Sequence, residues 1–545
     1  MPAQHSNTPA NASRITAAQL RHRLLQPDEI AVLDVREPGV QAHDGHLLRS
    51  VNLSLSTLEQ NVLARVPRKG TPIVLVDAGD NLLAGRAAQR LGTLGYRDIA
   101  VLEAGVQGWV ADGGELFTGT SALSKGFGEY VEQRFGTPHL SAEELKRRLD
   151  AGDDILLVDG RTLAEFSNFS IPGAVACPNG ELVHRVPALL NSPTTTVVVN
   201  CAGRTRSIIG AQTLINAGLE NPVLALENGT MDWLAAGFSL QHGVTNSAAK
   251  PGQLDGARRG ATQLVERFKV REIDFDTLER YRRQGDERSL YVLDVRTLEE
   301  YRAGHLPGAA WAEAGQLVQG VDNYVGTQNA RVVLVDDTEG LRAAVAASWL
   351  EQINWAEVSI LRVPAERASE QGVPAIEWAQ LPPPAQGITA AALADALGTG
   401  QATLLDLQDS LSFAAGHIPG AWFAVRARLP DRAEQLPGDG LLVLTSADGT
   451  LAQFAAAELA TLLARPIKVL VGGTAAWAAA GLPLEHGEQS LWDRPNDVWR
   501  SPYQAAGDRQ RAFREYLDWE LGLIAQLERD GTARFRHAPA QQEGV

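Results

Sequence analysis

Four times along this chain, a short apolar run ends in an aspartate, at intervals the size of a protein domain. Each aspartate is followed by a Gly-His or Pro-Gly turn and then by a second apolar run. The four residues are Asp34, Asp159, Asp294 and Asp406. They lie about 110 to 135 residues apart, and self-similarity at such a period indicates repeated folded units. The 545 residues are therefore expected to form four tandem domains instead of one large core.

The second apolar run of each unit indicates the fold class. In the second unit this run is Val197 to Asn200, in which three valines follow one another without polar alternation. Such runs are typical of strands buried on both faces of a parallel sheet. A loop and a helical segment, 208–217, follow. Strands that alternate with helices predict an α/β fold, in which each domain has a mainly parallel sheet flanked by helices.

Domain boundaries are placed where the composition changes to linker chemistry. Linkers are predicted at 117–138, at 246–260 and at the proline run 382–384. The predicted domains are 14–120, 138–244, 268–380 and 387–487. The remainder, 488–545, contains six aromatic residues between 492 and 519. That density predicts a helical C-terminal extension packed on a neighbouring domain, with the last residues, 537–545, as a disordered tail.

Composition excludes some functions. A net charge of −16 and an isoelectric point near 5.2 argue against nucleic acid or an anionic membrane surface as the main partner. No run approaches the roughly 18 apolar residues of a membrane span. The N-terminal residues are polar and lack the basic-then-apolar pattern of an export signal. With only two cysteines in the chain, a reducing compartment is favoured, and we expect a cytoplasmic protein.

The two cysteines have different contexts. Cys177 is interpreted as a small buried hydrophobic residue. Cys201 starts a six-residue loop, Cys-Ala-Gly-Arg-Thr-Arg, between a buried strand and a helix. Backbone N–H groups and the positive dipole end at a helix N-terminus stabilise a thiolate there and lower its pKa. Gly203 permits a tight turn, while Arg204 and Arg206 add positive charge suited to an anionic substrate.

These features resemble the rhodanese superfamily, and in particular its multi-domain bacterial thiosulfate sulfurtransferases. The resemblance covers nearly the whole chain before residue 485. Its motifs in the second unit are the Cys201 loop, the Asp159-x-Arg161 pair and Gly229-x-x-x-Trp233. It implies that Cys201 carries sulfane sulfur as a persulfide, from a small anionic donor such as thiosulfate to cyanide, a thiol or a protein cysteine. No metal or organic cofactor is expected.

The predicted site therefore has one catalytic residue, Cys201, in the only active domain. The predicted substrate-binding residues are Ala202, Gly203, Arg204, Thr205, Arg206 and Arg185. Arg185 is included because the corresponding segment of related sulfurtransferases often supplies a substrate-binding arginine, although a solvated surface arginine is an equally good interpretation. Asp159 and Arg161 are expected to form a supporting ion pair that fixes nearby loops, and not an acid–base couple.

The other three units are expected to be inactive. When their loops are aligned on the helices that follow, the residues at the position of Cys201 are Ala78, Asp337 and Ser446. None of these can form a persulfide, so these domains are interpreted as structural or as surfaces that recruit a partner. The repeated histidines His46, His305 and His417 are interpreted as turn-stabilising residues, because they lack the close partners of a metal site.

Two rival functions remain open. The first is a cysteine-dependent phosphatase or arsenate reductase, whose phosphate loop has the form Cys-x5-Arg. The sixth residue after Cys201 is Ser207, and the arginine, Arg206, comes one position earlier, so the count favours sulfur over phosphorus. The second is a non-enzymatic docking protein whose cysteine pocket senses sulfur or oxidants.

Overall fold

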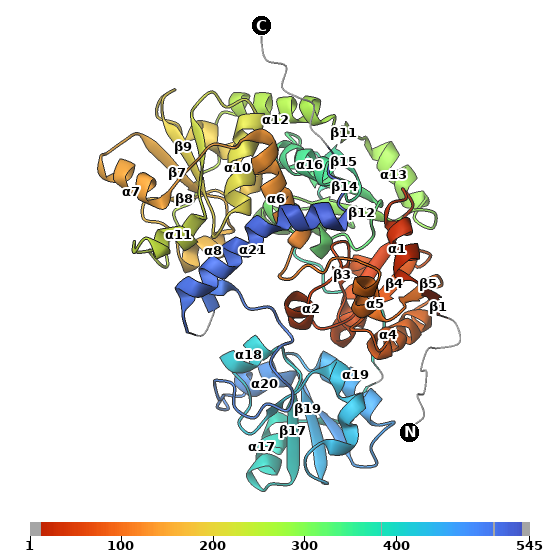
Figure 1. Cartoon of the computed structure of the whole chain (residues 1–545). Coiled ribbons are helices and arrows are strands. Elements are labelled where there is room, and N and C mark those ends of the chain that lie inside the picture. The colour runs from red at the N-terminus through yellow and green to blue at the C-terminus, as the bar shows by residue number, and fades with distance from the viewer. Residues whose placement is uncertain (1–11, 383, 505–506, 537–545) are drawn as a thin grey trace.

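The computed structural model describes residues 12–382, 384–504 and 507–536, so the predicted tail at 537–545 lies outside the described residues. Four five-stranded sheets, one for each repeat, follow one another along the chain (Figure 1). All four have the same strand order, in which the first strand lies at one edge and the fifth, fourth, second and third follow. Because every strand pair is parallel, the predicted α/β class is confirmed.

The first two domains have matching sets of elements. The strands of the first are β1 (Ser13–Ile15), β2 (Ala31–Asp34), β3 (Val51–Asn52), β4 (Ile73–Val76) and β5 (Ile99–Leu102). Its helices are α1 (Ala17–Leu24), α2 (Pro38–Asp44), α3 (Leu58–Arg65), α4 (Leu82–Thr93) and α5 (Gly105–Ala111). The strands of the second are β6 (His139–Leu140), β7 (Ile155–Asp159), β8 (Val175–Ala176), β9 (Thr196–Asn200) and β10 (Val223–Leu226). Its helices are α7 (Ala142–Asp150), α8 (Leu163–Asn168), α9 (Leu182–Arg185), α10 (Thr205–Asn216) and α11 (Gly229–Ala235).

The third domain differs by one helix, because its last strand is followed by no helix of the Gly-x-x-x-Trp type. Its strands are β11 (Arg271–Glu272), β12 (Leu290–Asp294), β13 (Ala310–Trp311), β14 (Arg331–Asp336) and β15 (Glu357–Arg362). Its helices are α13 (Phe275–Arg283), α14 (Leu298–Ala303), α15 (Ala314–Gln319) and α16 (Leu341–Ile353). The strands of the fourth are β16 (Gly387–Ile388), β17 (Ala402–Asp406), β18 (Trp422–Phe423), β19 (Leu441–Thr445) and β20 (Ile467–Leu470). Its helices are α17 (Ala390–Gly398), α18 (Ser410–Ala415), α19 (Thr450–Leu459) and α20 (Gly473–Ala479).

Two of the predicted linkers contain helices that the composition does not predict. Helix α6 (Ala122–Phe135) lies within 117–138, and α12 (Asp255–Phe268) begins within 246–260. Helix α6 is buried on most sides because α10 and the C-terminal helix α21 (Arg509–Asp530) both lie against it (Figure 1). Two glycines allow this approach. A Cβ on Gly126 would lie 2.6 Å from a methyl carbon of Leu527, and one on Gly128 would lie 2.8 Å from the methyl carbon of Thr205.

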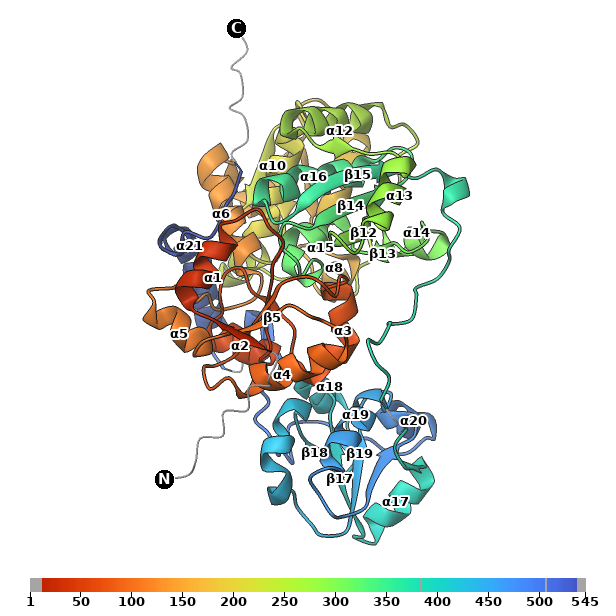
Figure 2. The same cartoon turned by 90° about the vertical axis from the view of Figure 1, so that its right-hand side faces the viewer.

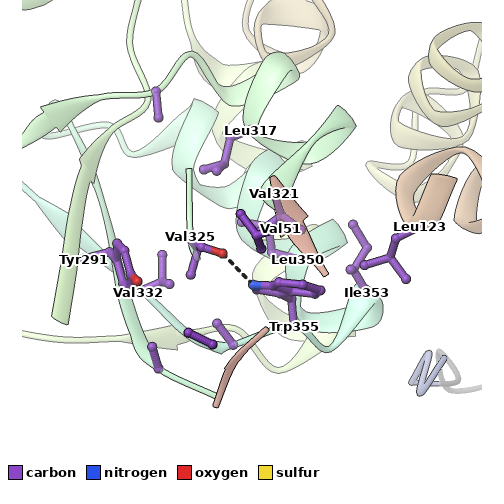
Figure 3. Packing of buried hydrophobic residues seen from close by; sticks show 14 of the residues in the cluster. Val51, Leu123, Tyr291, Leu317, Val321, Val325, Val332, Leu350, Ile353 and Trp355 are labelled. Carbon is purple, nitrogen blue, oxygen red and sulfur yellow. Dashed lines mark hydrogen bonds between the residues drawn. The ribbon is translucent and has the colours of Figure 1, made fainter. Parts of the chain in front are cut away.

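The first and third domains share one hydrophobic core with α6. Figure 3 shows Val51 of β3 and Leu123 of α6 beside Leu350, Ile353 and Trp355 of the third domain. The indole N–H of Trp355 donates to the Val325 carbonyl at 2.9 Å, so its one polar atom is satisfied inside the core. The first and third domains are therefore packed against each other and do not form separate cores.

No helix among the described residues is long and apolar enough to cross a membrane.

The fourth domain lies beside the first, and a segment without a helix or a named strand, 368–382, leads toward it from the third domain (Figure 2). It contacts the first domain through Arg426, which is 1% exposed and binds Glu59 at 2.8 and 3.0 Å and Glu458 at 2.5 Å. Glu59 lies on α3 of the first domain. A second ion pair across the same interface, Arg86 with Asp431 at 3.0 Å, is partly exposed.

Arg426→Leu is expected to destabilise this interface by about 3 kcal/mol, because it leaves two carboxylates with only Arg90 as partner. The matched change Arg86→Leu removes an exposed pair and should cost less than about 1 kcal/mol. Hydrogen exchange of the fourth-domain amides measures both effects. If both variants lose the same protection from hydrogen exchange, the buried ion pair of Arg426 does not contribute more than the exposed pair of Arg86, which would contradict this prediction.

Candidate active site

Cys201 lies at the carboxyl edge of the second sheet, directly after β9 and before α10. Its side chain is 2% exposed. The thiol donates to the carbonyl of Gly203 at 3.3 Å and accepts from the hydroxyl of Ser207 at 3.1 Å. Burial raises the pKa of the Cys201 thiol above its usual value, and the positive charge of Arg206 and hydrogen bonds with Ser207 and Gly203 oppose this rise only in part. The lowered pKa predicted from the sequence for this thiol is therefore wrong, because the loop is buried. The loop thus surrounds the sulfur with groups that stabilise negative charge.

The Gly-x-x-x-Trp motif packs against the backbone of the Cys201 loop. The backbone N–H of Thr230, at the start of α11, donates to the Cys201 carbonyl at 2.9 Å. Gly229 has φ +54, and a Cβ there would lie 2.3 Å from the same carbonyl oxygen. Only glycine permits so close an approach with a left-handed backbone. Trp233 is buried and anchors α11 through its N–H to the Ser239 carbonyl.

The two arginines of the loop are held by glutamates. Arg206 makes a bidentate pair with Glu165 of α8, at 2.7 and 2.8 Å. Although burial alone would raise it, the hydrogen bonds and charge of Arg206 hold the pKa of Glu165 at about 2. Arg204 pairs with Glu129 of α6 at 2.8 and 2.9 Å and also contacts Glu132. Much of the positive charge predicted for the pocket is therefore neutralised by neighbouring carboxylates.

Asp159 and Arg161 form a buried ion pair at 2.7 Å beside the loop. The register pairs Asp159 with Asn200, whose amide donates to the same carboxylate at 2.9 Å. Arg161 also donates to the Phe169 carbonyl at 2.6 Å. These contacts link the end of β7 to the end of β9. The pair thereby joins the two strand ends beside the loop, and its supporting role stays a prediction.

Arg185 is placed elsewhere. Its Nε donates to Glu181 at 2.6 Å, and a terminal nitrogen contacts the Ala248 carbonyl. It lines a cavity between the second and third domains, together with Lys250 and Glu300. The structure does not bring this guanidinium to the Cys201 loop, because its contacts lie on Glu181 and the chain leaving the second domain.

The C-terminal segment, which we define as residues 499–504 and 507–530, covers the loop, although sequence reasoning assigned it no functional residue. The Tyr503 hydroxyl donates to the Ala202 carbonyl at 3.0 Å and lies 2.6 Å from the Thr230 hydroxyl. Met231 packs in a buried cluster with Phe513 and Leu517 of this segment. The only signal for this contact in the sequence is the unusual aromatic density, which predicts packing but not its target.

Strand register corrects the alignment of two of the other three loops and agrees with the position predicted for Ser446. The residue that follows the paired strand end, as Cys201 follows Asn200, is in chain order Asp77, Asp336 and Ser446. Ala78 and Asp337 therefore do not occupy the position of Cys201. The reason is length: from this position to the first helical residue, the loops of the first and third domains are one residue longer than the Cys201 loop. An alignment made from the helices is shifted by that residue.

In the first and third domains, the aspartate at this position accepts hydrogen bonds from backbone N–H groups of its own loop and helix. Asp77 accepts from the backbone N–H groups of Gly79 at 2.9 Å and Ala84 at 3.1 Å. Asp336 accepts from the N–H of Arg342 at 2.8 Å and pairs with its guanidinium at 2.9 Å. A negatively charged side chain thus satisfies the N–H groups that would otherwise cradle a bound anion.

The repeated histidines make turn contacts. The Nδ1 atoms of His46, His305 and His417 lie 2.9 to 3.0 Å from backbone carbonyls in their own domains. Among the described residues, no group of three or more His, Cys, Asp and Glu side chains is arranged to hold a metal ion.

Comparisons with known proteins agree with this architecture. The chain is 44% identical to the thiosulfate sulfurtransferase of Pseudomonas aeruginosa, with a TM-score of 0.92 over 97% of this chain and 100% of that one. It is 27% identical to the putative sulfur carrier protein YrkF of Bacillus subtilis over 138 residues, which is 24% of this chain and 73% of YrkF. It is 36% identical over 106 residues to the transcriptional regulator Rv0324 of Mycobacterium tuberculosis, covering 19% of this chain and 46% of that protein.

A family model described as Rhodanese-like domain matches the chain four times, at residues 16–112, 141–236, 276–363 and 389–480. Each match contains the second to fifth strands of one of the four sheets. Because these matches together span more than half of its length, the chain belongs to the rhodanese family.

Proposed function

We propose that this protein is a thiosulfate sulfurtransferase that carries sulfane sulfur as a persulfide on Cys201. The observation that carries the proposal is the Cys201 loop, in which one buried thiol lies before a helix N-terminus and accepts a hydrogen bond from the Ser207 hydroxyl near the charge of Arg206. The likeness to a thiosulfate sulfurtransferase over 97% of the chain supports the choice of donor.

The first half-reaction forms the persulfide. The Cys201 thiolate attacks the outer sulfur of thiosulfate, an S–S bond forms to Cys201, and the old S–S bond breaks as sulfite leaves with the electron pair. Ser207 and the charge of Arg206 stabilise the anionic sulfur during this exchange. Because Arg206 is already bound by Glu165, its contribution is long-range charge and not a free bidentate clamp.

The second half-reaction returns the enzyme to its thiol form. An acceptor such as cyanide, a small thiol or a protein cysteine attacks the outer sulfur of the persulfide and leaves with it. Cys177 is packed in the hydrophobic core of the second domain, whereas Cys201 lies in the loop before α10 beside Ser207 and Arg206, so we assign the carrier role to Cys201. Both cysteines are free, which fits a reducing compartment such as the cytoplasm.

Mass spectrometry of the intact protein tests the proposal. After incubation with thiosulfate, the protein should gain the mass of one sulfur atom, mapped to the peptide that contains Cys201. Cyanide should then remove the added mass and release thiocyanate in equal amount. Absence of any gain with thiosulfate or another sulfane donor, together with hydrolysis of an aryl phosphate, would replace this function with the phosphatase alternative. Absence of both activities would favour a sensing role.

A further inference from the structure

One carboxylate of the C-terminal segment faces the Cys201 loop without a full set of partners. Glu520, in the middle of α21, is 1% exposed. Its Oε1 accepts from the Tyr516 hydroxyl at 2.9 Å, whereas its Oε2 has no hydrogen-bond partner among the described residues. A Cβ built on Gly203 would lie 3.5 Å from this Oε2, so the oxygen faces the backbone two residues after Cys201. Burying a carboxylate oxygen without a hydrogen-bond partner costs folding free energy, so a function for this oxygen is worth considering.

The neighbouring charges leave Glu520 as the available proton acceptor. Arg204 and Arg206 are bound by glutamates of α6 and α8. A further cation, Lys125 of α6, is 5% exposed, and its ammonium makes no hydrogen bond or ion pair with a described residue. Its Nζ lies instead 4.7 Å from the ring centroid of Trp519 and 5.0 Å from that of Tyr516. Lys125 thus supplies a positive field near Glu520 without occupying its free oxygen.

Delivery of sulfur to a thiol is faster when such an acceptor is present. A thiol is a poor nucleophile until it loses its proton, and a base positioned at the reacting atom removes this limit. We propose that Glu520 is the general base of the delivery step and that the physiological acceptors are therefore thiols. This inference rests on the function proposed above, because it concerns the second half-reaction of the same persulfide.

In this step one proton moves to Glu520 and one sulfur atom moves to the acceptor. The S–H bond of the acceptor breaks, and its proton moves to Oε2 of Glu520. The acceptor sulfur uses the freed electron pair to bond to the outer sulfur of the Cys201 persulfide. The S–S bond of the persulfide breaks, and its electron pair returns to the Cys201 thiolate. The acceptor leaves as a persulfide, and Glu520 later releases its proton to solvent.

The surroundings of Glu520 suit this task. Burial raises the pKa of the Glu520 carboxyl, the nearby charge of Glu129 adds to the rise, and Lys125, Arg204 and the Tyr516 hydrogen bond oppose it. A base with a pKa above that of an ordinary carboxylate accepts a thiol proton more readily. Tyr516→Phe removes one opposing contact, so the pH at which Glu520 becomes a base should move upward in that variant.

A single-turnover experiment tests the base directly. Wild-type protein and Glu520→Gln are loaded with thiosulfate, freed of donor and mixed with 2-mercaptoethanol at a series of pH values. The glutamine keeps the size of the side chain and its contact with Tyr516. We expect loading to be unchanged and delivery to be about 10- to 100-fold slower at neutral pH. This gap should close as the pH rises through the pKa of the thiol, and it should be smaller for the more acidic 2,2,2-trifluoroethanethiol.

The controls separate the two proposals. Glu515→Gln alters an exposed carboxylate of the same helix, paired only with Arg511, and should leave both steps unchanged. If the wild-type protein takes up no sulfur, the proposed function fails. If Glu520→Gln loads and delivers like wild type at every pH, the base is overturned while the function stands. A slowing of equal size for both thiols at every pH would make Glu520 a structural residue and would equally overturn the inference.

Discussion

Cys201→Ser is expected to abolish sulfur transfer, with a loss of more than about a thousandfold in thiocyanate formation. A serine hydroxyl does not form a persulfide, so the mass of one sulfur atom should not appear after incubation with thiosulfate. The fold should be unchanged, because the smaller oxygen can keep the hydrogen bond with Ser207 that the sulfur makes at 3.1 Å. Intact mass and the thiocyanate assay together measure the effect.

The matched control is Cys177→Ala, which removes the other thiol of the chain. Cys177 is fully buried in the core of the same domain, so the change should reduce stability modestly and leave sulfur loading intact. Sulfur uptake by Cys201→Ser, or loss of uptake in a folded Cys177→Ala protein, would show that the carrier is misassigned.

Gly229→Ala is the second substitution with a large expected effect. The new Cβ would lie 2.3 Å from the Cys201 carbonyl oxygen and 2.8 Å from that of Gly203, at a residue with φ +54. Either the loop or the start of α11 must shift, which displaces the sulfur from its donors. A displacement of about 1 Å at a reacting group costs roughly 100-fold in rate, and we expect a loss of that size in sulfur transfer.

The first domain offers a control with the same local strain. In Gly105→Ala the Cβ would lie 2.3 Å from the Asp77 carbonyl oxygen, at φ +50. Both substitutions force alanine into a left-handed backbone, which costs about 1 to 2 kcal/mol. The thermal unfolding temperature should therefore fall by a similar amount in the two variants, while only Gly229→Ala loses sulfur transfer activity. Equal activity losses would mean that global destabilisation, and not the geometry of the Cys201 loop, limits the rate.

Much of the fold can be predicted from local sequence signals. The fourfold strand-and-aspartate repeat predicts four α/β domains, and the structure confirms them together with the helical C-terminal segment. The two helices in the predicted linkers, α6 and α12, are exceptions, and α6 shows the physical reason. Its apolar and polar residues do not separate onto two faces, because α10 and α21 bury it from different sides. Gly126 and Gly128 resemble linker residues in sequence, yet they are small because neighbouring helices approach there.

Local sequence signals predict only part of the candidate site. The nucleophile and its loop are visible as a motif, and their roles stay predictions. The glutamates that bind Arg204 and Arg206 come from other elements, as does Glu520, which lies more than three hundred residues along the chain from Cys201. Loop length is equally hidden, since a one-residue difference before the helix shifts the alignment to Ala78 and Asp337. Only strand register resolves it.

The position of α21 at the far end of the chain has a consequence for biosynthesis. Domains fold as units during synthesis, from the N-terminus onward, so the second domain emerges and folds long before residues 509–530 exist. Until then, the Cys201 loop lacks the contacts of Tyr503, Tyr516 and Glu520, and we expect its thiol to be less shielded from oxidants. If Cys201 carries the sulfur as proposed, each new chain therefore passes through a period in which this thiol is less shielded, and that period ends when the C-terminal segment packs on the loop.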